Sequence, residues 1–127
     1  ILAGSGNSYT VPNGSTLEIQ GGTAGFDGTG GGAAVLVVAG TLRFTATGGA
    51  FGSLQEFRSG MNGLTEPDVV SNVALNGALE IDVTGAPAGS YDLIVADIVT
   101  GTPAPLITGG VASISYASVG RVILTVM

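Results

Sequence analysis

The fold is decided by a stretch whose layout recurs along the chain, Asn76-Gly77-Ala78-Leu79-Glu80-Ile81-Asp82-Val83-Thr84. After the Asn-Gly pair, apolar residues at 79, 81 and 83 alternate with polar residues at 80, 82 and 84. In a pleated strand this alternation places the apolar side chains on one face and the polar ones on the other. A further apolar strand, Val73-Ala74-Leu75, comes directly before the pair. Because Asn and Gly both tolerate positive φ, the pair predicts a tight hairpin or a sharp corner between two strands.

The same order of strand, glycine corner and strand occurs five times. The corner glycines are at positions 14, 40, 77, 101 and 120, which by subtraction lie 26, 37, 24 and 19 residues apart. Repeats of this length are typical of coiled stacks of strands. We therefore predict an all-β fold, a short right-handed β-solenoid-like stack with an antiparallel C-terminal hairpin formed by strands at 111–117 and 121–126. The alternative is a two-sheet antiparallel β-sandwich of the jelly-roll kind, in which the glycines lie in hairpin turns.

The composition predicts a single soluble domain, residues 1–127, with little charge. Charged residues make up 9% of the chain, the net charge is −6, and the cations are Arg43, Arg58 and Arg121, with no Lys. Because a phosphate backbone requires clustered cations, we expect no nucleic-acid partner. No apolar run is long enough to span a bilayer, so we expect no membrane insertion.

Export is expected on other grounds. The chain begins at Ile1 rather than Met, which fits a mature product after removal of a signal segment. The absence of Lys leaves few cleavage sites for trypsin-like proteases, and Cys is absent as well. The sequence therefore predicts a secreted protein at the cell surface, without disulfides or thiolate metal sites.

Three segments depart from the regular strand pattern. We interpret the glycine-rich run 21–32 as a flexible connector, because it lacks the Lys and the following helix of a phosphate loop, and its one carboxylate, Asp27, is too few for calcium. The apolar run 33–39 predicts a strand that is covered on both faces. Ser53 and Glu56 have the spacing of a capping box, which predicts a short helical insertion at 53–63.

The reactive side chains argue against catalysis. His, Cys and Lys are all absent, which removes the usual general base, thiol nucleophile and Schiff-base amine. Glu80 and Asp82 share one strand face, and glycosidases use paired carboxylates. Alternate acidic residues are also what an exposed polar strand face contains, and we adopt this interpretation. We expect no enzyme activity, no catalytic residue, no cofactor and no bound metal.

Three segments of the second half carry a resemblance to known proteins. They are residues 77–85, 88–94 and 111–126, in which glycine corners, leucines and alternating strands recur. Together, residues 76–126 resemble the terminal β-solenoid region of exported bacterial surface proteins, namely autotransporter-type passengers and PEP-CTERM-like proteins. The resemblance implies export and a role at the surface or in a matrix, and it implies no catalytic residue.

These observations favour a structural protein. We expect a subunit of an extracellular filament, sheath or matrix that assembles non-covalently with copies of itself through β-edge pairing and apolar packing. Residues 1–6 could join subunits as an arm, and the candidate interface residues are Ile1, Leu2, Val35, Val37, Ile123 and Val126. The alternative is a monomeric adhesin or glycan-binding module, in which the glycine-rich loop and the 53–63 insertion would bind surface glycans.

Overall fold

The computed structural model describes residues 8–21, 23–27, 34–57, 71–96 and 98–127, which form strands and turns and contain no helix. The prediction of an all-β fold is confirmed. The strands of this part of the chain are β1 Ser8–Val11, β2 Thr16–Ile19, β3 Thr23–Asp27, β4 Ala34–Val38, β5 Thr41–Thr45, β6 Ser53–Phe57, β7 Ser71–Leu75, β8 Ala78–Asp82, β9 Gly89–Val95, β10 Ile98–Thr100, β11 Leu106–Thr108, β12 Ala112–Ser115 and β13 Arg121–Val126.

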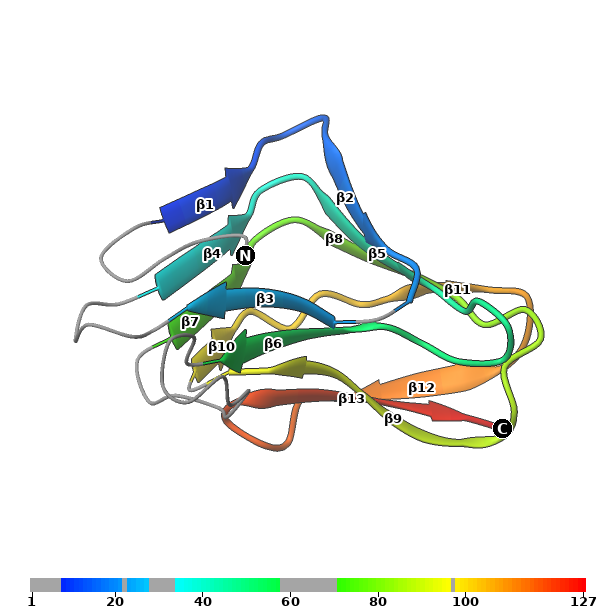
Figure 1. The fold of residues 1–127 in the computed structure, drawn as a ribbon. Helices are drawn as coiled ribbons and strands as arrows, with labels where there is room; N and C mark the ends of the chain where they lie inside the picture. Colours follow the sequence, from blue (N-terminus) through cyan, green and yellow to red (C-terminus); the bar gives the residue numbers. More distant parts are fainter. Residues whose placement is uncertain (1–7, 22, 28–33, 58–70, 97) are drawn as a thin grey trace.

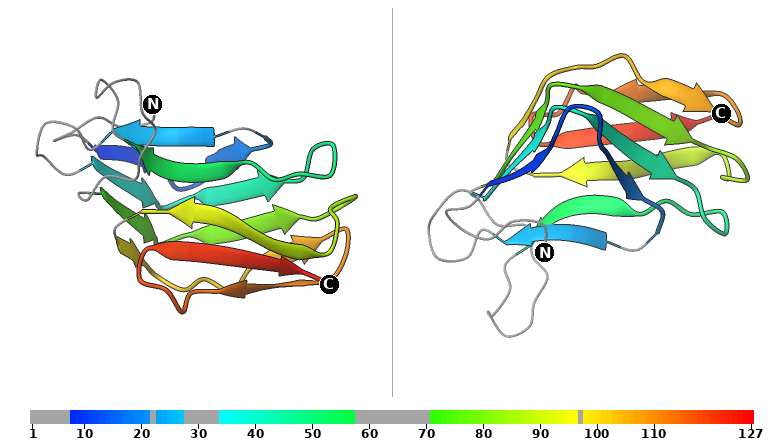
Figure 2. Two further views of the ribbon diagram at one scale, coloured as in Figure 1. Left: turned by 60° about the horizontal axis from the view of Figure 1, so that its bottom comes forward. Right: turned by 90° about the horizontal axis from the view of Figure 1, so that it is seen from above.

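Each strand from β1 to β8 pairs in parallel with the strand three places later in the chain. The strands therefore stack in three sheets, which we name sheet A (β1-β4-β7-β10), sheet B (β2-β5-β8-β11) and sheet C (β3-β6-β9-β13-β12). The chain passes through the three sheets in order and then begins the next turn beside the previous one (Figures 1 and 2). Residues more than twenty positions apart in the sequence thus become neighbours.

Four of the five predicted corners connect sheet A to sheet B, at Gly14, Gly40, Gly77 and Gly101. Hydrogen bonds link the first three of these corners from turn to turn: the Thr41 N–H donates to the Ser15 carbonyl and the Ala78 N–H to the Gly40 carbonyl, both at 2.9 Å. The fifth, Gly120, lies between β12 and β13 and belongs to an antiparallel hairpin. The glycine repeat of the sequence therefore corresponds to the corners between sheets A and B, and the last of these corners is at Gly101.

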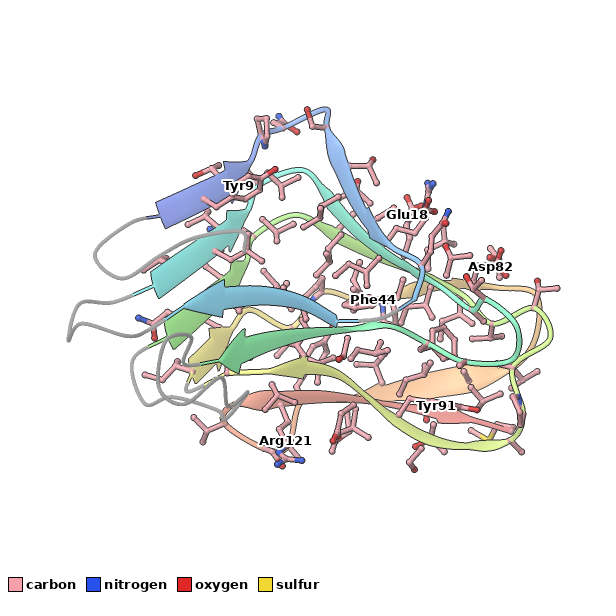
Figure 3. All side chains as sticks on the ribbon, viewed as in Figure 1. Tyr9, Glu18, Phe44, Asp82, Tyr91 and Arg121 are labelled. Carbon is pink, nitrogen blue, oxygen red and sulfur yellow. The ribbon has the colours of Figure 1, made fainter. Side chains whose placement is uncertain are left out.

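The alternating residues fill the interior of the coil. In sheet B, the parallel register places Leu42 beside Leu79 and Phe44 beside Ile81, so that apolar side chains of successive turns contact one another (Phe44 in Figure 3). Burying one such side chain stabilises the fold by about 1.5–3 kcal/mol. One cluster contains all the buried apolar residues of the described chain, Val11, Ile19, Leu36, Val38, Leu42, Phe44, Leu54, Val73, Leu75, Leu79, Ile81, Val83, Leu93, Ile94, Val122, Leu124 and Val126.

The C-terminal hairpin is present and adds two strands to sheet C. β12 pairs with β13 in antiparallel fashion, from Ala112 beside Val126 to Ser115 beside Ile123, and β13 pairs antiparallel with β9. The Tyr116 hydroxyl donates to the Pro103 carbonyl at 2.6 Å, which ties the hairpin to the β10–β11 connection. Within the described ranges, the antiparallel strand pairing on which the sandwich alternative rests occurs only at β12–β13 and β13–β9.

The helix predicted at 53–63 is wrong. Residues Ser53–Phe57 form β6, which lies between β3 and β9 in sheet C, and residues 58–63 are outside the described residues. A two-turn helix is marginal in water. As a strand, the same segment forms hydrogen bonds to neighbours on both sides and buries Leu54 completely. Pairing across turns therefore outweighs the local capping signal.

The flexible connector predicted at 21–32 is also wrong for its central part. Thr23–Asp27 form β3, which pairs in parallel with β6 from Thr23 beside Ser53 to Asp27 beside Phe57. Gly25 lowers the intrinsic strand propensity of this segment, but the neighbouring strand supplies the pairing that propensity scales do not include. Positions 22 and 28–32 lie outside the described residues.

No helix of the described chain is long and apolar enough to cross a membrane.

Candidate functional site

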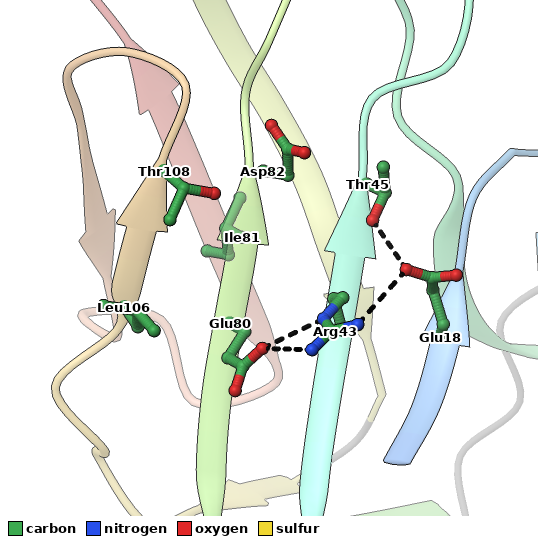
Figure 4. A pocket seen from close by; sticks show the side chains of 8 residues that line it. All are labelled: Glu18, Arg43, Thr45, Glu80, Ile81, Asp82, Leu106 and Thr108. Atoms are coloured by element: carbon green, nitrogen blue, oxygen red, sulfur yellow. Dashed lines mark hydrogen bonds and ion pairs between the residues drawn. The ribbon is translucent and has the colours of Figure 1, made fainter.

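Sheet B carries a ladder of charged side chains on its outer face. Because Leu42 and Phe44 point into the core, Arg43 between them points outward. The register places Arg43 beside Glu18 of the previous turn and beside Glu80 of the next turn. Three successive turns of the coil thus contribute one charge each to the same row (Figure 4).

The ladder is held by hydrogen bonds and ion pairs. The Nε and Nη2 atoms of Arg43 donate to Oε1 of Glu80 at 2.9 and 2.6 Å, and Nη1 lies 3.8 Å from Oε2 of Glu18. These contacts, with Glu80 first, raise the pKa of Arg43. Hydrogen bonds from Gln20 and then from the Thr45 hydroxyl lower the pKa of Glu18, and Arg43 adds to this effect. Arg43 and Glu18 therefore stay charged at neutral pH.

Asp82 stands in the next row, beside Thr45 and Thr108. Its Oδ1 atom accepts hydrogen bonds from the hydroxyl of Thr84 at 2.6 Å and from the Thr84 backbone N–H at 3.0 Å. The hydroxyl bond, followed by the backbone bond, lowers the pKa of Asp82. Asp82 is accordingly ionised at neutral pH and contributes a third carboxylate to this face.

The two rows enclose a shallow groove of about 300 Å³, which is open to solvent (Figure 4). Three carboxylates and one guanidinium give it a formal charge of −2. Leu106, which pairs in register with Glu80 and is 58% exposed, gives the groove an apolar edge. The lining residues are Glu18, Arg43, Thr45, Glu80, Ile81, Asp82, Leu106 and Thr108.

The chemistry of the groove is hydrogen bonding and charge. Within the described part of the chain, no group of three or more His, Cys, Asp or Glu residues is placed to hold a metal ion. The carboxylates can accept hydrogen bonds from hydroxyl or amine groups, whereas an anionic ligand would meet the negative charge. Glu80 and Asp82 both lie on the outer polar face, as the alternation of the sequence indicates.

The three sheets end in open edges at both ends of the coil. In the residues that the structure describes, β1, β2 and β3 have no neighbouring strand at one end, and β10, β11 and β12 have none at the other. The edge of β10 is partly covered, because the Val99 N–H donates to the Val119 carbonyl of the β12–β13 turn at 2.9 Å. All six strands run in the same direction within their sheets, because the two antiparallel steps β9–β13 and β13–β12 cancel. Open edges present unpaired N–H and C=O groups, which are templates for pairing with another strand.

Apolar side chains are exposed mainly near the second of these ends. Six large apolar residues of the described chain are exposed, and five of them lie at positions 98–127. The last turn and the hairpin therefore carry most of the exposed large apolar side chains. The exposed fractions are 37% for Tyr9, 45% for Ile98, 58% for Leu106, 69% for Val111, 72% for Val119 and 69% for Met127.

The candidate interface residues lie in different places. Val35 and Val37 are half-buried in the rows of sheet A that alternate with its buried residues, and Ile123 is half-buried in sheet C. The assignment of Val126 to the interface must be corrected, because this residue packs in the core with 6% of its surface exposed and its side chain is not accessible to a partner. Ile1, Leu2 and the arm at 1–6 lie outside the described residues. The structure thus does not gather these residues in one surface.

The charged ladder was missed by sequence reasoning, although a signal for it exists. Arg43 and Glu80 each follow a corner glycine by three residues, and Glu18 follows Gly14 by four. Each also lies directly after the first buried or half-buried leucine of its strand. Alignment of the corners by their leucines would have placed all three charges in one row.

Comparison with known proteins gives no relative of this chain: no family model, no curated protein and no solved structure matches it.

Proposed function

We propose that the chain is a structural subunit of an extracellular filament, sheath or matrix, and that its three sheets are a short right-handed β-solenoid whose copies join non-covalently through strand edges. The observation that carries this proposal is the common direction of the edge strands at both ends of the coil. When a second copy approaches head to tail, its edge strands run parallel to the edge strands that they face, as neighbouring strands do within each sheet. Backbone hydrogen bonds can then form between copies.

The low charge of the surface supports the same proposal. In sheet A, the rows that alternate with the buried ones contain no charged side chain among the described residues. Little electrostatic repulsion therefore opposes the approach of copies. The residues of these rows with described exposure are Thr10, Val35, Val37, Asn72, Ala74, Ile98 and Thr100.

Sedimentation velocity over a dilution series, with electron microscopy of the same samples, tests the proposal. We expect concentration-dependent association and particles of regular width. Ser113→Lys places a charge on the edge strand β12 and should weaken association. Ser118→Lys, at an exposed position in the β12–β13 turn, is the matched control and should associate as the unmodified protein does. A monomer at every concentration would refute self-assembly.

A second candidate function is that of a glycan-binding module, which the groove on sheet B favours. Its carboxylates, the Arg43 guanidinium and the Thr108 hydroxyl are groups that hydrogen-bond sugar hydroxyls. Screening immobilised neutral and acidic glycans tests this function. Asp82→Asn should weaken binding, whereas Asp92→Asn, which alters an exposed carboxylate of sheet C, should not. Equal binding by both variants would exclude the groove.

A further inference from the structure

The two ends of the coil do not have the same shape. Sheet C contains five strands, whereas sheets A and B contain four each. The additional strand lies at the end formed by the C-terminal part of the chain, because β13 is inserted between β9 and β12 (Figure 2). Neighbouring strands are about 4.8 Å apart. β12 therefore extends about one strand spacing beyond the level of β10 and β11.

From this offset we infer that copies of the chain are joined by a single strand pair, in which β12 of one copy pairs in parallel with β3 of the next. This inference rests on the proposed self-assembly and names the strands that carry it. When one copy approaches another end to end, β12 is the first strand to reach hydrogen-bonding distance of the facing edge. Sheets A and B then remain about 9.6 Å apart across the junction, twice the strand spacing, and backbone hydrogen bonds do not span that distance.

The direction of the strands allows this pair. β3 is parallel to β6 and β9, and β12 is parallel to β9 because two antiparallel steps separate them. Adding β3 of a second copy beside β12 thus continues sheet C with the parallel pairing that it has at its other end. The antiparallel insertion of β13 does not change the sense of the edge.

The sequence of β12 also leaves its edge unprotected. Edge strands are usually blocked by charged residues or by Pro. β12 consists of Ala112, Ser113, Ile114 and Ser115, without a charge or a Pro. In contrast, β11 at the same end follows Pro105 directly. Of these two edges, β12 is the better suited to accept a further strand. At the facing end, β2 carries Glu18 and β3 carries a charge only at its last residue, Asp27.

Disulfide cross-linking tests the inference cleanly, because the chain has no Cys of its own. One preparation carries Ser113→Cys in β12, and the other carries Thr23→Cys or Gly25→Cys in β3, so that two registers are sampled. The preparations are mixed at a concentration at which the unmodified protein associates, and are then oxidised. Adjacent strands bring Cα atoms within the 4.4–6.8 Å that a disulfide requires. The matched control combines Ser113→Cys with Thr10→Cys in β1, the corresponding edge strand of sheet A.

We expect a disulfide-linked pair between β12 and β3 on a non-reducing gel, and none between β12 and β1. As a second measurement, Ser113→Lys should weaken association by about tenfold or more, whereas Ser118→Lys in the exposed β12–β13 turn should not. Association without a β12–β3 cross-link, or with a β12–β1 cross-link, would overturn this inference and leave the proposed function intact. Absence of any association would overturn both.

Discussion

At the scale of single residues, Gly77 illustrates how closely the turns of the coil approach one another. A Cβ atom at this position would overlap the carbonyl oxygen of Gly40 in the turn before and would lie 2.5 Å from that of Ala39. Gly40 has the same relation to the carbonyl oxygens of Pro12 and Ser15. At Gly40 and Gly77, a glycine is therefore needed for space between turns.

Replacing Gly77 with Ala should destabilise the protein. The backbone of two adjacent corners would have to move apart, and we expect a loss of about 1–3 kcal/mol in the free energy of unfolding, the range typical of overpacking. Urea unfolding followed by circular dichroism measures this loss. Gly21→Ala is the control, since a Cβ there meets no atom within 4 Å and its φ is not positive. Equal stability of the two variants would contradict the role assigned to the corner.

Thr84→Val should raise the pKa of Asp82, because it removes the hydroxyl that donates to Oδ1. A carboxyl group whose pKa is lowered on folding adds stability above its unfolded pKa, about 3.9, and this stability is lost as the pH falls through the lowered value. The variant should therefore be less stable at pH 7 and should approach the unmodified protein near pH 2. NMR titration and urea unfolding at both pH values measure these effects. Thr100→Val, an exposed change on β10 with no carboxylate bond in the described residues, should leave the pKa unchanged.

At the scale of elements, β6 shows that pairing decides structure where local signals are weak. Its sequence has the spacing of a helix cap, yet β3 and β9 lie on either side of it. Leu54 contacts the core and is completely buried. A strand in this position is stabilised by pairing with its two neighbouring strands, which belong to segments far away in the sequence.

Leu54→Ala should cost about 2–5 kcal/mol, the range for truncating a fully buried leucine. Leu17→Ala in β2 should cost less, because Leu17 is only partly buried. Both variants can be compared by urea unfolding at pH 7. If the change at Leu54 were no more costly than the change at Leu17, β6 would not be an integral strand of sheet C.

The sequence predicts the elements that carry their own signal. The strand at 121–126 was expected with the bounds that it has. The strand predicted at 111–117 is shorter in the structure, where β12 extends from Ala112 to Ser115. β3, β6 and the charged ladder depend on which turns become neighbours. Alternation within one strand does not contain that information.

At the scale of the whole molecule, the C-terminal hairpin completes the core. Leu93 and Ile94 of β9 are fully buried, and so are Val122 and Leu124 of β13, which pairs with β9. Without the hairpin, β9 would become an edge strand and the core would be open at that side. The last seventeen residues thus contribute to the stability of all the preceding turns.

A chain that ends at Gly110 should therefore not fold cooperatively. We expect a broad thermal transition by circular dichroism and binding of a dye that recognises exposed apolar surface. The full chain with Met127→Ser is the control, because Met127 is 69% exposed and its replacement removes little buried surface. A sharp transition in the shortened chain would show that the turns are stable without the hairpin.

The parallel stacking of the turns also determines how the molecule would respond to mechanical force. β1 and β12 lie at opposite ends of the coil, and the hydrogen bonds between turns are directed from one end to the other. A pull along this direction loads the turns in series, so the outermost turn would detach before the next one. From the corner glycines at 14, 40, 77 and 101, each turn holds 24–37 residues, which corresponds to about 80–130 Å of extended chain. Such a subunit would lengthen in discrete steps under tension and would absorb work at each step before it ruptures.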